Sequence, residues 1–138
     1  MRGEAVGVIW CVAMQKIGAA DLSASLFDIR RDLSVSVRPR KPGPPERIDG
    51  MTLGIQTVAH DAPHGGEVHP DGDEILYVAS GRVRVTLESA KDAPVELGPG
   101  EACVVPRGEW HRVSIVEPAL LINITPGPNG DHRPLPIK

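Results

Sequence analysis

Short apolar runs separated by glycine and proline dominate the chain from residue 48 onward, and they constrain the fold more than any other feature. Residues 82–88 alternate between polar and apolar side chains, which is typical of a half-buried β-strand. The predicted strands are 51–59, 66–69, 74–79, 82–88, 94–97, 101–105, 111–116 and 119–124. A series of short strands with tight turns between them predicts an all-β sandwich or barrel.

The segments that flank these strands have a different character. Residues 21–33 carry leucine and isoleucine at helical spacing, which predicts one short amphipathic helix. Residues 38–47 contain four prolines and are expected to form an extended connector. We therefore divide the chain into an N-terminal extension with helix and arm (1–47), a barrel (48–125) and a proline- and glycine-rich tail (126–138), which we expect to be extended.

Composition and charge exclude several classes of function. The net charge of −3 shows no basic excess that would favour nucleic acid, and no basic amphipathic helix favours a membrane surface. Cys11 and Cys103 have no CxxC partners, so a reduced, cytoplasmic setting is the simpler expectation. Residues 5–14 are apolar but too short to span a bilayer; they resemble a secretory signal weakly, and Met14 is an alternative natural start.

Four side chains in two segments carry the chemistry of the chain. Glu67 and His69 are two residues apart and share one face of a strand, Glu74 opens the next strand after a turn, and His111 opens a later one. Two carboxylates and two imidazoles aimed at one point predict a divalent metal site. This mixed set suits Mn(II), Fe(II), Zn(II), Ni(II) or Co(II), and the order of affinities alone does not choose among them.

Alternatives remain open for some of these residues. Glu67 is a fourth metal ligand or, beside a three-ligand metal, a free general base or a substrate contact. His60 and His64, in the loop before that strand, are candidates for the missing imidazole or for proton transfer, and otherwise form a polar loop at the barrel rim.

Further polar residues are candidates for substrate contacts. Gln56 and Asn123 lie in apolar strands and either contact a substrate or are amides satisfied by the backbone. Arg47 or Arg112 is a candidate anchor for a substrate carboxylate or phosphate. The basic residues of the connector are most simply solvated; they are Arg38, Arg40 and Lys41.

The two metal-site segments resemble the two signature motifs of the cupin superfamily. The first motif is G-x5-H-x-H-x(3,4)-E-x6-G, and the chain reads Asp61-x5-Glu67-x-His69-x4-Glu74-x6-Gly81. The second is G-x5-P-x-G-x2-H-x3-N, and the chain reads Gly100-x5-Pro106-x-Gly108-x2-His111-x3-Ile115. The departures are Asp61 for glycine, Glu67 for histidine and Ile115 for asparagine. The resemblance covers roughly residues 50–124.

This resemblance implies a small single-domain cupin with a double-stranded β-helix, or jelly-roll, barrel. It implies a metal-dependent enzyme of the isomerase, lyase, decarboxylase or oxygenase type that acts on a small polar acid or sugar derivative. A non-enzymatic metal- or ligand-binding cupin, such as a sensor or accessory protein, is the alternative, and a structural barrel with a vestigial site is a third. A homodimer is the first expectation for its assembly.

Overall fold

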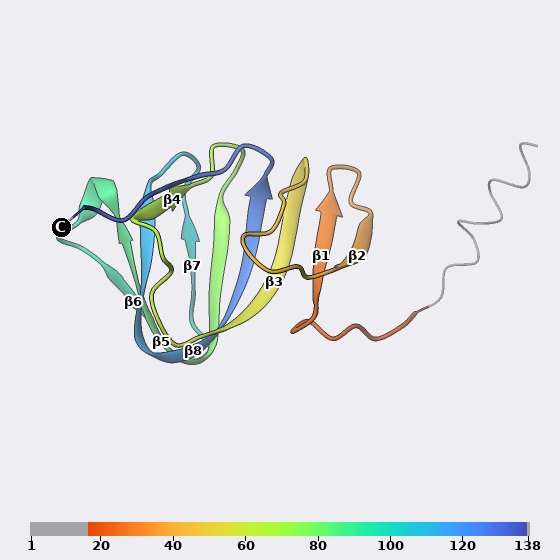
Figure 1. The fold of residues 1–138 in the computed structure, drawn as a ribbon, viewed down its shortest axis with the longest axis horizontal. Coiled ribbons are helices and arrows are strands. Elements are labelled where there is room, and N and C mark those ends of the chain that lie inside the picture. The colour runs from red at the N-terminus through yellow and green to blue at the C-terminus, as the bar shows by residue number, and fades with distance from the viewer. Residues whose placement is uncertain (1–16, 138) are drawn as a thin grey trace, which may run out of the picture.

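The computed structural model describes residues 17–137 as an antiparallel β-structure (Figure 1). No α-helix occurs within these residues, and no helix there is long and apolar enough to span a bilayer. The strands are β1 (Ser25–Arg30), β2 (Val35–Pro39), β3 (Gly50–Val58), β4 (Gly66–Val68), β5 (Glu74–Leu87), β6 (Val95–Leu97), β7 (Ala102–Val105), β8 (His111–Gly127) and β9 (Asp131–Arg133). A short 3₁₀ helix, η1 (Glu88–Ala90), follows β5.

One sheet contains all nine strands, in the order β2-β1-β3-β8-β4-β9, with β5 pairing to β6, β7 and β8. In Figure 1 the longer strands stand side by side, while β4 and the C-terminal segment cross near one end. The apolar core lies on the inner face of β5, β6, β7 and β8. Its buried members are Leu76, Val78, Val83, Val85, Leu97, Val105, Ala119 and Leu121.

The predicted helix over residues 21–33 is wrong, because β1 and β2 form an antiparallel pair there. Leu26 and Asp28 alternate inward along β1, and the buried Asp28 carboxylate accepts hydrogen bonds from Arg38 Nε (2.7 Å) and Thr52 Oγ1 (2.8 Å). These contacts come from β2 and β3. The apolar spacing that indicated a helix is therefore also compatible with a strand. In this strand the inward-facing Asp28 forms hydrogen bonds with residues of neighbouring strands.

Two predicted strand pairs are continuous in the structure. Residues 74–79 and 82–88 belong to β5, and residues 111–116 and 119–124 belong to β8. Gly81 lies at the irregular part of the β5–β8 ladder with φ of 80°, and a Cβ atom there would collide with the Pro118 carbonyl oxygen. Glycine at this position is therefore a corner within a long strand, where two backbones come together.

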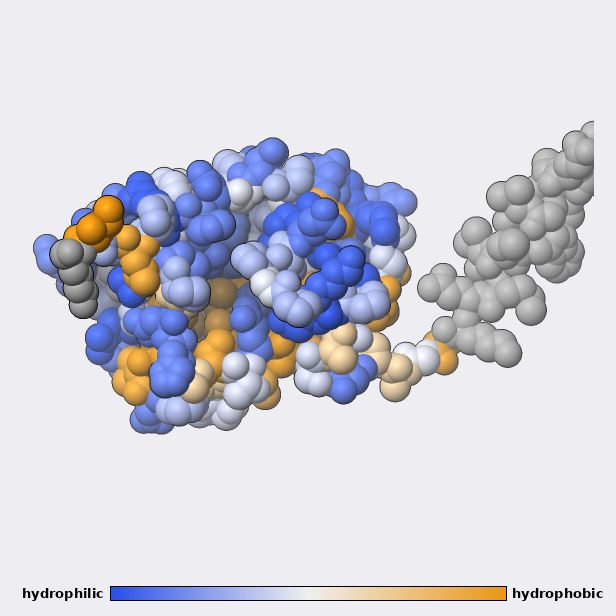
Figure 2. All heavy atoms as spheres, viewed as in Figure 1, coloured by the Kyte–Doolittle hydropathy of each residue, from blue (hydrophilic) through white to orange (hydrophobic). Residues whose placement is uncertain are grey.

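The face of the molecule in Figure 2 is largely hydrophilic and is hollowed near the centre of the view. The proline-rich connector between β2 and β3 contributes to a cavity of about 780 Å³, together with the loop before β4 and the start of the tail. The tail, predicted to be extended, contributes β9, which pairs with β4.

Candidate metal centre

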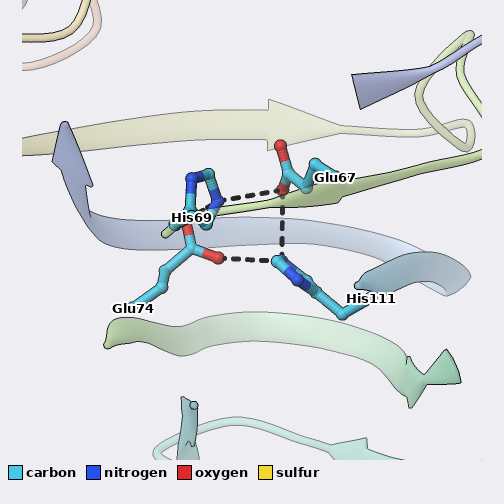
Figure 3. A group of neighbouring side chains, drawn as sticks. All are labelled: Glu67, His69, Glu74 and His111. Atoms are coloured by element: carbon cyan, nitrogen blue, oxygen red, sulfur yellow. Dashed lines mark hydrogen bonds and ion pairs between the residues drawn. The ribbon is translucent and has the colours of Figure 1, made fainter. Parts of the chain in front are cut away.

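Glu67, His69, Glu74 and His111 converge on one point (Figure 3). Each offers a ligand atom, and these four atoms lie within 4.8 Å of one another. The residues come from β4 and the turn after it, from the first position of β5 and from the first position of β8. Neither His60 nor His64 belongs to this group, so the tetrad contains Glu67 as its fourth member.

Strand pairing explains this convergence. Glu67 and His111 are direct cross-strand partners between β4 and β8. The close approach depends on Gly66, whose φ is 142° and whose missing Cβ atom would lie 3.1 Å from the His111 carbonyl oxygen. On the other side, Leu87 at the end of β5 pairs with His111. The first residue of β8 is thus fixed between two strands and aims its ring at the carboxylates.

Glu74 is the central member of the tetrad. Its Oε1 atom lies 3.1 Å from His111 Nε2, and its Oε2 atom lies 3.3 Å from His69 Nε2. Glu67 Oε1 is farther away, at 3.5 Å from His111 Nε2 and 3.9 Å from His69 Nε2. The Glu67 side chain is also 30% exposed, against 3% for Glu74. Glu74 is therefore the fixed carboxylate and Glu67 the accessible one.

A chain of side-chain hydrogen bonds orients Glu74. Thr125 Oγ1 donates to Glu74 Oε2 at 2.6 Å and accepts from Asn123 Nδ2 at 2.7 Å. Gln56 Nε2 in turn donates to Asn123 Oδ1 at 3.2 Å. Two predicted substrate contacts, Gln56 and Asn123, thus belong to a network behind the tetrad and also line the cavity. Such partners hold a metal ligand in position.

The two histidines differ in how their second ring nitrogen is satisfied. Nδ1 of His111 lies 3.1 Å from the Glu109 carbonyl oxygen and donates to it, which leaves Nε2 free to ligate. Both ring nitrogens of His69 are buried without a hydrogen-bond partner of good geometry. A buried unsatisfied nitrogen is costly, and a metal ion at the centre of the tetrad would satisfy Nε2. The donor set and this orphaned atom both fit a divalent metal.

In the absence of metal, the charges of the two histidines and the two glutamates of the tetrad balance. Burial lowers the pKa of both histidines, but their contacts with Glu67 and Glu74 outweigh it and raise the pKa of His69 to about 9 and of His111 to about 10. Burial raises the pKa of both glutamates, yet hydrogen bonds with the histidines hold the pKa of each below its usual value. Two imidazolium groups thus face two carboxylates at neutral pH, and a metal must displace the imidazolium protons.

The 780 Å³ cavity opens over Glu67 and His69. His60 and His64 both line it. Arg112 is in another place: it lines a separate groove beside Trp110 and lies 3.6 Å from Asp61 in an ion pair. Within residues 17–137, the structure therefore brings the two candidate proton-transfer histidines to the cavity of the tetrad and does not bring Arg112 there.

Sequence reasoning missed Thr125 and Arg40 in this region, whereas Arg47 was already a candidate substrate anchor. Thr125 follows a predicted strand and carries no motif signal, although its hydroxyl holds Glu74. Arg40, expected to be solvated, lines the cavity with its Nε buried, and Arg47 lines the same cavity. No local sequence pattern indicated that Arg40 would line the cavity.

Comparison with known families gives one match, to the model described as "Cupin domain", over residues 54–125. This is just over half of the 138-residue chain and includes all four residues of the tetrad. No curated protein sequence matches the chain significantly.

Solved structures of similar fold are distant. A cupin-2 domain containing protein from Shewanella frigidimarina is 24% identical, with 60% of this chain and 76% of that chain covered and a TM-score of 0.47. A protein from Bacillus halodurans is 29% identical, with 62% and 69% covered and a TM-score of 0.45. Oxalate decarboxylase from Bacillus subtilis, described as having Mn(II) centres, is 22% identical, with 62% and 24% covered and a TM-score of 0.48.

Proposed function

This chain belongs to the cupin family, and we propose that it is a metal-dependent cupin enzyme acting on a small polar molecule in the cavity above the tetrad. The observation that carries the proposal is the convergence of four ligand atoms within 4.8 Å, among them a buried His69 whose ring nitrogens make no hydrogen bond of good geometry. A cavity of about 780 Å³ is in the range of small-molecule sites.

In this proposal Glu67, His69, Glu74 and His111 hold the metal. When bound, the metal supplies a Lewis acid that polarises a substrate oxygen. Thr125 and Glu109 keep Glu74 and His111 in their ligating orientations. The carboxylate at position 67, where the motif has histidine, makes the donor set harder and favours Mn(II) or Fe(II) over softer ions.

The residues at the cavity rim supply proton transfer in this account. Nδ1 of His64 accepts a hydrogen bond from the Gly66 backbone N–H at 3.3 Å, so the neutral ring carries its proton on Nε2. His64 can therefore donate a hydrogen bond from Nε2 to a molecule in the cavity, and His60, in the same loop, is the candidate for proton transfer. Isomerase, lyase, decarboxylase and oxygenase chemistry all use such groups beside a metal.

Metal binding tests the proposal directly. Purified chain, stripped of metal and then given Mn(II), Fe(II), Zn(II) or Ni(II) in turn, should bind at least one ion and melt several degrees higher, because an ion that binds only the folded state stabilises it. His111→Ala should abolish both effects, while His60→Ala, at the exposed rim, should keep them. A wild-type chain that binds none of these ions would refute the proposal. If the chain binds Fe(II), oxygen uptake by that form would identify an oxygenase.

The expected homodimer is also a proposal. One face of the sheet carries an apolar row of direct cross-strand partners that runs from β2 to β7: Val37, Phe27, Leu53, Ile124, Ile75 and Val104. Val37, Ile75 and Val104 are 53%, 38% and 61% exposed. The opposite face of the same strands holds the buried polar residues of the site. A second copy that covers this row would remove it from water.

A further inference from the structure

Two arginines of the proline-rich connector line the cavity from the side of the N-terminal segment. Arg40 follows β2 directly, and Arg47 precedes β3. Both line the cavity into which Glu67 and His69 also open. The connector thus brings two permanent positive charges to the same space as the proposed metal centre.

Arg47 has no ion-pair partner among the described residues. Its Nη1 atom is buried and makes no hydrogen bond, and no carboxylate of residues 17–137 lies within ion-pairing distance of it. Its backbone packs against Gly127 at the end of β8, where an added Cβ atom would lie 2.5 Å from the Arg47 Cβ atom. The absence of a side chain at Gly127 therefore permits the position of Arg47.

Arg40 is anchored through one nitrogen of its guanidinium. Its Nη2 atom donates to the Ile55 carbonyl oxygen at 2.7 Å, which fixes the group against β3. Its Nε atom is buried and has no partner. Because a guanidinium is planar and rigid, fixing one nitrogen also fixes the direction of the remaining N–H donors.

Arg38, two residues before Arg40, has hydrogen-bond partners within the fold for its guanidinium. Arg38 Nε donates to the buried Asp28 carboxylate at 2.7 Å, and Nη2 donates to the Glu46 carbonyl oxygen at 2.5 Å. Arg40 and Arg47 have no such acid, although burial of an unpaired donor on a charged group costs stability. Both arginine side chains line a cavity that is large enough for a ligand.

We propose that Arg40 and Arg47 form a subsite for the oxyanion group of a small organic anion whose other end reaches the tetrad. The oxyanion is a carboxylate or a phosphate ester, since both match the guanidinium fork. The contact at the tetrad rests on the proposed metal-dependent function, whereas the arginine contact does not require a metal. Arg112 lines the separate groove and pairs with Asp61, and it has no part in this subsite.

Calorimetric titration of the full-length, metal-loaded chain tests the subsite. The probes are two dicarboxylates, malonate and succinate, and two phosphates, inorganic phosphate and glycerol phosphate. We expect one of the two families to bind, and its identity distinguishes carboxylate from phosphate ligands. Arg47→Gln and Arg40→Gln should each weaken that binding by about tenfold to a hundredfold, because each removes charge-assisted hydrogen bonds. Arg47→Lys, which keeps the charge but not the fork, should only partly restore it.

The matched control is Arg84→Gln. Arg84 lies on β5, is exposed and pairs with Glu96 at 2.7 Å. This variant should bind the probes as the wild type does. Melting curves and metal content are measured for every variant. Failure of all four probes to bind, or equal binding by wild type, Arg47→Gln and Arg40→Gln, would overturn the subsite even if metal binds. A chain that binds no metal but binds a probe through Arg47 would instead refute the proposed function and leave the subsite standing.

Discussion

Thr125 links the proposed metal ligand Glu74 to the buried polar network of the sheet by hydrogen bonds. Its hydroxyl donates to Glu74 Oε2 and accepts from Asn123, and it is completely buried. Glu74 in turn contacts both histidines. The Thr125 hydroxyl thus helps to orient the central carboxylate.

Replacement of this hydroxyl should weaken metal binding while the fold persists. Thr125→Val keeps the shape of the side chain but leaves Glu74 without its donor, so metal affinity should fall about tenfold to a hundredfold in a metal titration. Thr57→Val, on the exposed face of β3, is the control and should bind metal normally. Equal affinity in Thr125→Val and wild type would show that Thr125 does not support the site.

The pKa values of the tetrad predict opposite pH dependences for the metal-free and metal-bound chain. The raised pKa values of His69 and His111, about 9 and 10, give the metal-free fold stability that is fully present below pH ~6.5 and is lost as pH rises through these values. The lowered pKa values of Glu67 and Glu74 give stability that is present above pH ~4.5 and lost in acid.

Metal must displace the imidazolium protons, so its affinity should rise with pH over the range in which the metal-free fold loses stability. The gap in melting temperature between the two forms should therefore widen from pH 6 to pH 9, measured at constant free metal. A gap that stays constant or narrows over this range would contradict the assignment of both histidines as ligands.

At the scale of elements, the approach of β4 to β8 builds the site. Gly66 combines a positive φ with a neighbouring carbonyl oxygen of His111 at 3.1 Å from its absent Cβ atom. Gly100 has a similar backbone strain, with φ of 83°, but no atom within 4 Å of that position. A comparison of substitutions at the two glycines therefore distinguishes the effect of a positive φ from the effect of the close contact between β4 and β8.

Gly66→Ala should lower both stability and metal affinity, because it pushes β4 away from His111. Gly100→Ala should lower stability alone, by about 1 kcal/mol. Chemical denaturation and metal titration of both variants measure the two effects. If Gly66→Ala binds metal like Gly100→Ala, the spacing of β4 and β8 does not set the site.

The sequence allowed prediction of the features that depend on local spacing. Glu67 and His69 are two residues apart on one strand, and Glu74 follows a turn, so the tetrad could be recognised and the structure brings it together. The positions of Thr125, Arg40 and Arg47 depend on contacts between distant segments, which no local pattern contains. Gly81 was predicted to separate two strands, but it lies at a corner within β5. A turn and such a corner need the same backbone freedom, so the sequence does not distinguish them. The helix over 21–33 failed because Asp28 is satisfied by distant strands.

At the scale of the whole molecule, the apolar row from Val37 to Val104 predicts self-association. We expect the wild-type chain to sediment as a dimer, and Ile75→Glu with Val104→Glu to yield a monomer, because charges placed in a buried apolar contact stay unpaired. Val116→Glu, at a position that is 43% exposed and outside the row, should remain dimeric. A monomeric wild type, or a dimer unaffected by both charges, would contradict this assembly.

Anomalous diffraction from crystals of the full chain grown with Mn(II) tests the central claim most directly. The account predicts an anomalous peak at the manganese edge within coordinating distance of Glu67, His69, Glu74 and His111, and no such peak in crystals of His111→Ala. A peak bound by other residues, or none at the tetrad under saturating metal, would contradict the claim that these four side chains form a metal centre.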